Sequence, residues 1–258
     1  MRIPTRIPTT FVRDTALVYG RCLRQSLRSP LALLFGLLMP LLYLLFFGPL
    51  LTRLPLGGRS SSWQVLVPGL LLQLGLFGAA FAGFGVIVEK AQGVVERMRV
   101  TPVSRPALLL GRVLRDATVI VFQAVLLVLA AMPLGLRAPL PGVLIGFGFV
   151  ALLTVALGSL SYAAAMRVST PQEFGPMINA VTMPSMLLSG LMLPISLGPA
   201  WLDVLSHLVP FRYLVDAMRD AYAGTYTSAH MLYGVLVAVA FATLAVTVGT
   251  RAFRTAGA

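Results

Sequence analysis

Few residue types in this chain could do chemistry, and their positions rule out most reactions. Ser159 and Ser161 lie in a Gly-Ser-Leu-Ser stretch that suggests a serine protease acting inside a membrane. A serine nucleophile needs an adjacent base to take its proton. The two histidines, His207 and His230, lie at or beyond the edges of the long apolar stretches, so no span offers such a base. We expect both serines to bond to the backbone of their own helix.

Metal, nucleotide and proton chemistry find no support in the sequence either. The two histidines have no carboxylate pair at ligand spacing, so we expect no metal site. The chain has no Gly-x-x-x-x-Gly-Lys-Ser/Thr loop for a nucleotide phosphate, and its long uncharged stretches hold no carboxylate or histidine that could relay protons. We expect a protein that is not itself an enzyme, has no cofactor of its own and draws its energy from a partner.

Composition places the chain in a membrane. Hydrophobic residues make up 58% of its 258 residues and charged residues 11%, and the mean hydropathy is +0.90. A soluble domain has about a quarter charged residues. A membrane-spanning helix needs roughly 20 apolar residues. Six stretches free of Asp, Glu, Lys and Arg meet that length: 31–51, 64–88, 117–136, 138–166, 174–202 and 231–250. They predict an all-α polytopic membrane protein with six transmembrane helices.

Basic residues indicate how the chain is oriented. Its net charge of +12 is interpreted as a topology signal rather than as a sign of nucleic-acid binding. With both termini cytoplasmic, fifteen of the 20 Lys and Arg residues lie on the cytoplasmic side, in 1–30, 89–116, 167–173 and 251–258. We therefore expect one multi-pass domain over 1–258 in the plasma membrane. It consists of a cytoplasmic amphipathic segment (1–30), a six-span bundle (31–250) and a cytoplasmic tail (251–258).

The N-terminal segment 11–28 has the pattern of an amphipathic helix. Its apolar face carries Val12, Ala16, Tyr19, Leu23 and Leu27, with Leu17 as the exception. Its opposite face carries Arg13, Arg21, Arg24 and Arg28. Such a helix lies at the membrane surface with its arginines toward anionic headgroups. Whether it also contacts a cytoplasmic partner is left open by the pattern.

Residues 89–101 form a second amphipathic segment on the same side. Its charges have both signs around a small apolar stripe, which favours docking into a groove on another protein over lipid anchoring. Thr101-Pro102 ends this helix, because the residue before a proline avoids helical geometry. The alternative is an interfacial helix that only marks topology. The residues expected to contact the partner are Glu89, Ala91, Val94, Val95, Glu96, Arg97 and Met98.

The stretch 186–224 is too rich in proline for one continuous helix. Pro194, Pro199 and Pro210 interrupt it. We expect a span that ends near Pro194, followed by two short helices at about 199–208 and 211–222 that dip into the outer leaflet or cap the bundle. Arg212 with Asp216, and Asp216 with Arg219, have the spacing of helical ion pairs. Trp201 belongs to the same region.

Small residues recur four apart, which lets helix backbones approach closely in lipid. The pairs are Ala79/Gly83, Gly142/Gly146 and Ser185/Ser189. Helix packing within one chain is the favoured interpretation, and a seam between two copies is the alternative.

Together these features resemble the type-2 ATP-binding-cassette (ABC) exporter permeases, in particular the daunorubicin-resistance-like drug-efflux branch. The stretches that carry the resemblance are MPLLYLLFFGPLL (39–51), EKAQGVVERMRVTPVSRPALLLGRVLRD (89–116) and LPISLGPAWLDVLSHLVPFRYLVDAMRD (193–220). The resemblance implies an N-terminal connecting helix, a coupling helix at 89–101 between spans two and three, and a re-entrant helix pair at 194–222. It also implies two ATPase subunits that bind ATP and Mg²⁺, and a second permease that is an identical or related chain.

In such a permease the substrate path runs between the two copies, along spans one, two and five. The candidates in these spans are large apolar or isolated amide side chains suited to an amphipathic drug or lipid: Phe46, Phe47, Gln73, Phe77, Asn179 and Met183. Packing against neighbouring helices is an equally good explanation for each one. The cargo could instead be a lipid-linked saccharide or a lipid. In a different class of function, the chain would be a membrane scaffold that recruits a soluble protein without transport.

Overall fold

The computed structural model describes residues 8–51, 62–92, 104–168, 170–191, 195 and 198–255. These residues form helices joined by short turns, with no strand among them, so the predicted all-α fold is confirmed for this part of the chain. The helices are α1 (Pro8–Leu27), α2 (Pro30–Leu51), α3 (Ser62–Ala80), α4 (Phe84–Ala91), α6 (Arg105–Ala131), α7 (Leu140–Arg167), α8 (Pro171–Leu188), α9 (Ala200–Ser206), α10 (Pro210–Ala223) and α11 (Ala229–Thr255).

Five helical segments of the described chain are long and apolar enough to cross a membrane. They are Leu33–Leu50, Ser62–Lys90, Pro106–Ala131, Leu140–Arg167 and Ala229–Ala252. The multi-pass architecture follows from them. α8, which occupies the expected fifth span, is not among the five, and its first turn carries Glu173. The count of six spans therefore stays a prediction.

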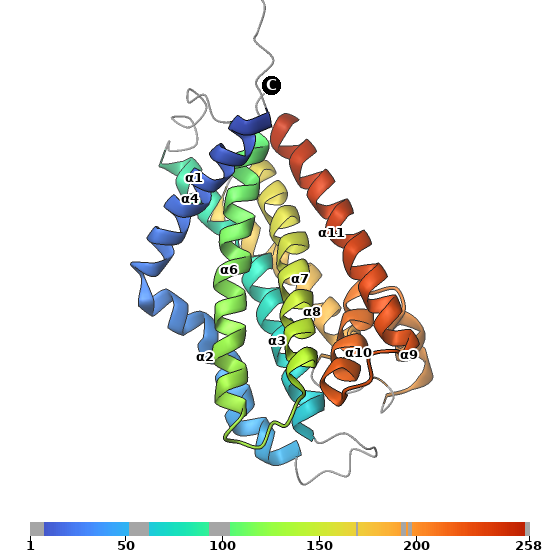
Figure 1. The fold of residues 1–258 in the computed structure, drawn as a ribbon. Helices are drawn as coiled ribbons and strands as arrows, with labels where there is room; N and C mark the ends of the chain where they lie inside the picture. The colour runs from blue at the N-terminus through green and yellow to red at the C-terminus, as the bar shows by residue number, and fades with distance from the viewer. Residues whose placement is uncertain are drawn as a thin grey trace, which may run out of the picture.

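The helices are arranged around a central group of α3, α6 and α7 (Figure 1). α11 packs against α7 along one side, and α1 runs obliquely along the part of α6 nearest its start. α2 continues from the lower end of α1 toward the opposite end of the bundle, where α9 and α10 lie. The start of α1 and the C-terminal end lie at the same end, which we call the α1 end.

Proline and glycine set several helix boundaries. Proline stands in the first turn of α6, α7, α8 and α10, where its missing N–H has no helical partner to lose. α10 ends at Gly224, whose φ of +83° is the left-handed conformation that glycine adopts without strain. Gly135, with φ +114°, makes the turn between α6 and α7.

Small residues bring helices of the same chain into close contact. A Cβ added to Gly142 of α7 would lie 2.0 Å from the carbonyl oxygen of Ala221 in α10. One turn further on, a Cβ at Gly146 would lie 2.9 Å from the ring of Tyr222. A Cβ at Gly83 would meet the carbonyl oxygen of Ser161 at 2.5 Å. At these positions the interpretation of packing within one chain accounts for the small residues.

The second apolar stretch is one span built from two helices, because the chain breaks between α3 and α4 at residues 81–83. Ser161 of α7 satisfies the backbone groups that the break leaves open. Its hydroxyl donates to the Ala80 carbonyl at 2.5 Å and accepts the Gly83 N–H at 2.9 Å. The expectation that both serines bond to their own helix is thus confirmed for Ser159, which donates to Val155 O, and is wrong for Ser161.

Candidate functional site

The first turns of α6 direct three charged side chains into the bundle. Arg112, Arg115 and Asp116 are three and four residues apart, so they share one face of the helix. That face points toward α4 and α7, and only 8% of Arg112 and 7% of Asp116 remains exposed. Charges buried to this degree are stable only when they are paired and hydrogen-bonded.

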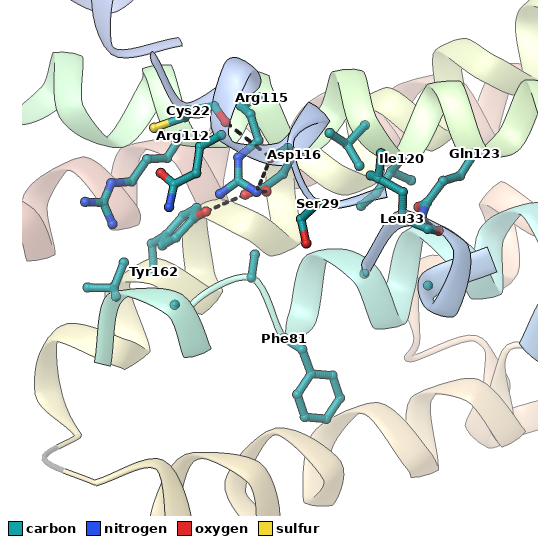
Figure 2. A pocket seen from close by; sticks show the side chains of 18 of the residues that line it. Cys22, Ser29, Leu33, Phe81, Arg112, Arg115, Asp116, Ile120, Gln123 and Tyr162 are labelled. Atoms are coloured by element: carbon teal, nitrogen blue, oxygen red, sulfur yellow. Dashed lines mark hydrogen bonds and ion pairs between the residues drawn. The ribbon is translucent and has the colours of Figure 1, made fainter. Parts of the chain in front are cut away.

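Every one of these charges has a partner, and Figure 2 shows those of Arg115 and Asp116. Arg112 Nη2 lies 2.5 Å from Glu89 Oε2 at the end of α4. Arg115 Nη1 lies 3.0 Å from Asp116 Oδ1, and the hydroxyl of Tyr162 in α7 donates a hydrogen bond to Asp116 Oδ2. We call these five residues the charge cluster. It joins α4, α6 and α7 through side-chain contacts alone.

A cavity of about 580 Å³ lies beside the charge cluster, where α1 turns into α2. We call it the elbow cavity. Its walls come from the end of α1 and the start of α2, from the break between α3 and α4, and from α6 and α7. Gln123 of α6 closes the far side, with its Nε2 donating to Leu33 O of α2 at 2.8 Å. On the α1 side, Arg115 Nη1 donates to Ser26 Oγ at 3.3 Å.

Sequence reasoning did not find the charge cluster or the elbow cavity. The third apolar stretch was defined by the absence of charge, so it began directly after Asp116 and left the cluster outside the membrane. A signal was present. Arg112, Asp116 and Gln123 fall on one face of a helix that continues without a break into the apolar stretch.

The expected docking segment, residues 89–101, begins at Glu89, a member of the charge cluster. Glu89 pairs with Arg112, and Lys90 Nζ lies 3.5 Å from Met166 O and 3.4 Å from Val168 O at the end of α7. Ala91 is the last residue of α4. The other expected docking residues lie outside the described residues: Val94, Val95, Glu96, Arg97 and Met98.

The N-terminal amphipathic pattern corresponds to α1. The four arginines expected on its polar face are all exposed: Arg13, Arg21, Arg24 and Arg28. Val12, Ala16 and Leu27 of the predicted apolar face are exposed as well, and the contact with α6 comes from the edge of that face, where the hydroxyls of Tyr19 and Thr118 are hydrogen-bonded at 3.1 Å. A Cβ added to Gly111 of α6 would lie 2.8 Å from Val18, so the two helices are in close contact. The role of α1 as a connecting helix stays a prediction.

The six residues proposed for a substrate path fall into two groups. Phe46 and Phe47 of α2 and Asn179 and Met183 of α8 are exposed, and Phe77 of α3 is half-buried. Gln73 is different, because it is buried in the centre of the bundle and its Oε1 has no hydrogen-bond partner among the described residues. The structure thus places Gln73 inside one chain rather than on the outer face with the four exposed residues.

The expected short helices are present as α9 and α10, and Arg212 connects them. Arg212 Nη1 lies 2.7 Å from Asp203 Oδ1 in α9, and its Nε lies 3.7 Å from Asp216 Oδ2 in α10. The Arg212–Asp216 pair was predicted from spacing, and the Asp203 contact was not. Trp201 is exposed, Pro210 begins α10, and Pro194 lies outside the described residues.

Arg219 interacts electrostatically with Asp216, as its spacing suggested, and it also makes two longer-range hydrogen bonds. Its Nη2 donates to Gly190 O at 2.8 Å, and its Nε donates to Val65 O at 3.4 Å. Burial lowers the pKa of this guanidinium to about 10, so it stays charged at neutral pH. Arg219 therefore ties α10 to the end of α8 and to the start of α3.

Comparison with known proteins identifies the family. The sequence profile described as "ABC-2 type transporter" matches residues 14–223, from α1 to the end of α10. The chain belongs to the ABC-2 type transporter family. Over 218 residues it is 25% identical to the putative transport permease ycf38 of Cyanophora paradoxa, covering 83% of this chain and 75% of that protein.

Two further relatives of this ABC-2 type chain carry names that refer to drug resistance. The daunorubicin resistance ABC transporter permease protein DrrB1 of Streptomyces coeruleorubidus is 26% identical over 220 residues, which cover 84% of this chain and 77% of the relative. The probable doxorubicin resistance ABC transporter permease protein DrrC of Mycobacterium tuberculosis is 25% identical over 234 residues, which cover 84% and 81%. The resemblance noted from the sequence is confirmed, and the chain is a multi-pass ABC transporter permease.

Proposed function

We propose that this permease moves an amphipathic, drug-like or lipid-like substrate out across the plasma membrane, driven by a separate ATPase. The observation that carries the proposal is the family match over residues 14–223, together with the similarity to relatives named for daunorubicin and doxorubicin resistance. Two permeases and two ATPases, with ATP and Mg²⁺ bound to the ATPases, would form the working unit. Reconstituting the permease with its ATPase and measuring ATP-dependent movement of an amphipathic dye tests it.

In the proposed topology α8 is the fifth of six spans. α7 and α11 run in the same direction through the bundle, so the chain must return between them (Figure 1). α8 starts beside α4, where the rings of Phe84 and Phe174 are 6.3 Å apart. Just beyond its end, Gly190 is bonded to α10. A return through α8 keeps both termini on the side that holds most of the basic residues, which we assign to the cytoplasm.

The ATPase would act on the chain through residues 89–101. At the start of this segment, Glu89 is held by α6 and Lys90 by the end of α7. A displacement of the segment would therefore be passed to α4, α6 and α7 together. Closure of the ATPases on ATP provides the differential affinity that such a switch between inward-open and outward-open states requires.

Val94→Asp and Met98→Asp should each reduce copurification of the ATPase about tenfold or more, because a carboxylate that is desolvated in an apolar groove has no partner there. Leu208→Asp is the matched control, since it makes the same kind of change at an exposed leucine at the opposite end of the bundle. Copurification and substrate-stimulated ATP hydrolysis are measured for all three. If the Val94 and Met98 variants retain both copurification and substrate-stimulated ATP hydrolysis, residues 89–101 do not dock on the ATPase.

The substrate path would use the outward faces of α2 and α8, which expose Phe46 and Met183. Phe46→Ala and Met183→Ala should each change resistance to at least one amphipathic compound about fivefold, the effect of removing one good apolar contact. Leu244→Ala on exposed α11 is the control and should change none. Resistance profiles are compared at equal membrane expression. Unchanged profiles for both variants would remove these two residues from the path.

A further inference from the structure

The elbow cavity has the features of a ligand site that the permease function does not require. We propose that it binds the phosphate group of a membrane lipid headgroup in the leaflet at the α1 end of the bundle. That leaflet is the cytoplasmic one in the proposed topology. Only its assignment to the cytoplasmic side rests on the proposed function. The argument uses three properties of the cavity: its hydrogen-bond donors, its position and its shape.

The cavity lining holds two guanidinium and two carboxylate groups, and an anion there would bind to guanidinium N–H groups that the carboxylates leave unused. Both carboxylates of the charge cluster already accept from guanidinium groups, and Asp116 also accepts from Tyr162. Arg115 uses one terminal nitrogen, Nη1, for its contacts with Ser26 and Asp116, and its Nε is buried, so its other terminal nitrogen, Nη2, is the donor left for a ligand. A guanidinium with unused donors matches the oxygens of a phosphate.

Hydroxyl, amide and thiol groups from α1 extend this donor surface. Gln25, Ser29 and Cys22 line the cavity on that side. The exposed arginines Arg24 and Arg28 do not line the cavity, but they are neighbours in sequence of Gln25 and Ser29, which do. They add positive charge to this part of the chain, which favours an anion.

Position and shape favour a lipid as the source of that phosphate. The cavity lies where α1, an amphipathic helix, turns into α2, the first candidate span. Leu33 and Gly36 of α2 line the cavity. Leu34 and Leu38 of the same helix are apolar and exposed. A lipid whose headgroup is bound in the cavity can therefore place its acyl chains along α2. The volume of about 580 Å³ is in the range of small-molecule sites and exceeds what a bare phosphate fills.

Cys22 provides the measurement, because it is the single cysteine of the chain and lines the cavity. The purified full-length chain in a neutral detergent is treated with a small thiol reagent. Short-chain phosphatidylglycerol should slow modification of Cys22 several-fold, and the matching short-chain diacylglycerol, which lacks the phosphate, should not. Inorganic phosphate forms a third arm. Slowing by the lipid alone assigns the site to a headgroup, and slowing by both assigns it to the phosphate itself.

Two glycines offer a matched pair of variants. Gly85 lines the cavity, and Gly148 of α7 does not. A Cβ added at either position would meet no atom within 4 Å. Gly85→Leu should therefore occupy part of the cavity and weaken the effect of phosphatidylglycerol on Cys22 several-fold. Gly148→Leu should preserve it. At the exposed position Ser29, a change to Glu should raise the lipid concentration needed about fivefold, and a change to Gln should not.

Equal slowing by diacylglycerol and phosphatidylglycerol would overturn the proposal, as would no slowing by any ligand. A lipid effect that is undiminished in Gly85→Leu would place the site elsewhere and overturn it too. The assay contains no ATPase and no transport step. Its failure would leave the exporter function standing, and failure of ATP-dependent transport would leave this result unaffected.

Discussion

Replacing Asp116 with alanine is expected to destabilise the chain by about 3–5 kcal/mol, the cost of breaking a buried ion pair from one side. The variant leaves Arg115 without its carboxylate and leaves the Tyr162 hydroxyl without its acceptor, in a region where Asp116 is only 7% exposed. The measurement is thermal unfolding in mild detergent, monitored as the loss of the monodisperse folded fraction. We expect the folded yield to fall sharply as well.

The same change at an exposed ion pair is the control for this prediction. Asp203 pairs with Arg212 at 2.7 Å, but its side chain is 45% exposed. Solvent screens that pair, so Asp203→Ala should cost about 1 kcal/mol or less. Tyr162→Phe should fall between the two, because it removes one hydrogen bond to a buried carboxylate and keeps the ring. A loss of stability for Asp116→Ala no greater than for Asp203→Ala would show that the charge cluster does not hold α6 and α7 together.

The charge cluster also marks the limit of what the sequence could predict. Hydropathy located the helices that became α2, α7 and α11, because crossing a bilayer imposes a length and a composition that one sequence reveals. Proline spacing located α9 and α10 for a similarly local reason, since proline restricts its own residue and the one before it. These predictions needed no knowledge of neighbouring helices.

What the sequence did not predict depended on contacts between distant parts of the chain. Ser161 bonds to backbone groups 78 and 81 residues away, and no local pattern shows that the chain breaks at 81–83. Arg219 bonds to Val65 across 154 residues, a contact beyond the Asp216 interaction that its spacing suggested. For Gln73, the pattern identified a polar group in a span but not the side of α3 on which it lies, and its role in a substrate path stays a prediction. Tertiary packing decided each of these outcomes.

Close packing at glycine leads to the second large effect. Gly142→Ala should destabilise the chain by about 3 kcal/mol, because the new Cβ would lie 2.0 Å from the carbonyl oxygen of Ala221 and 2.7 Å from its carbonyl carbon. These atoms belong to the backbone of α10, so no side chain can rotate away and the two helices must separate. The separation would also disturb the Arg212 contacts that join α9 to α10.

Gly148→Ala in the same helix should have the opposite effect and stabilise the chain. A Cβ at Gly148 meets nothing within 4 Å, so only the helix preference for alanine over glycine remains, a gain of up to about 1 kcal/mol. The two variants thus differ only in the contact with α10. Their apparent unfolding temperatures in the same detergent should lie on opposite sides of the parent value. Equal temperatures for both would mean that α7 and α10 are not in backbone contact and that Gly142 is available for an interface with another chain.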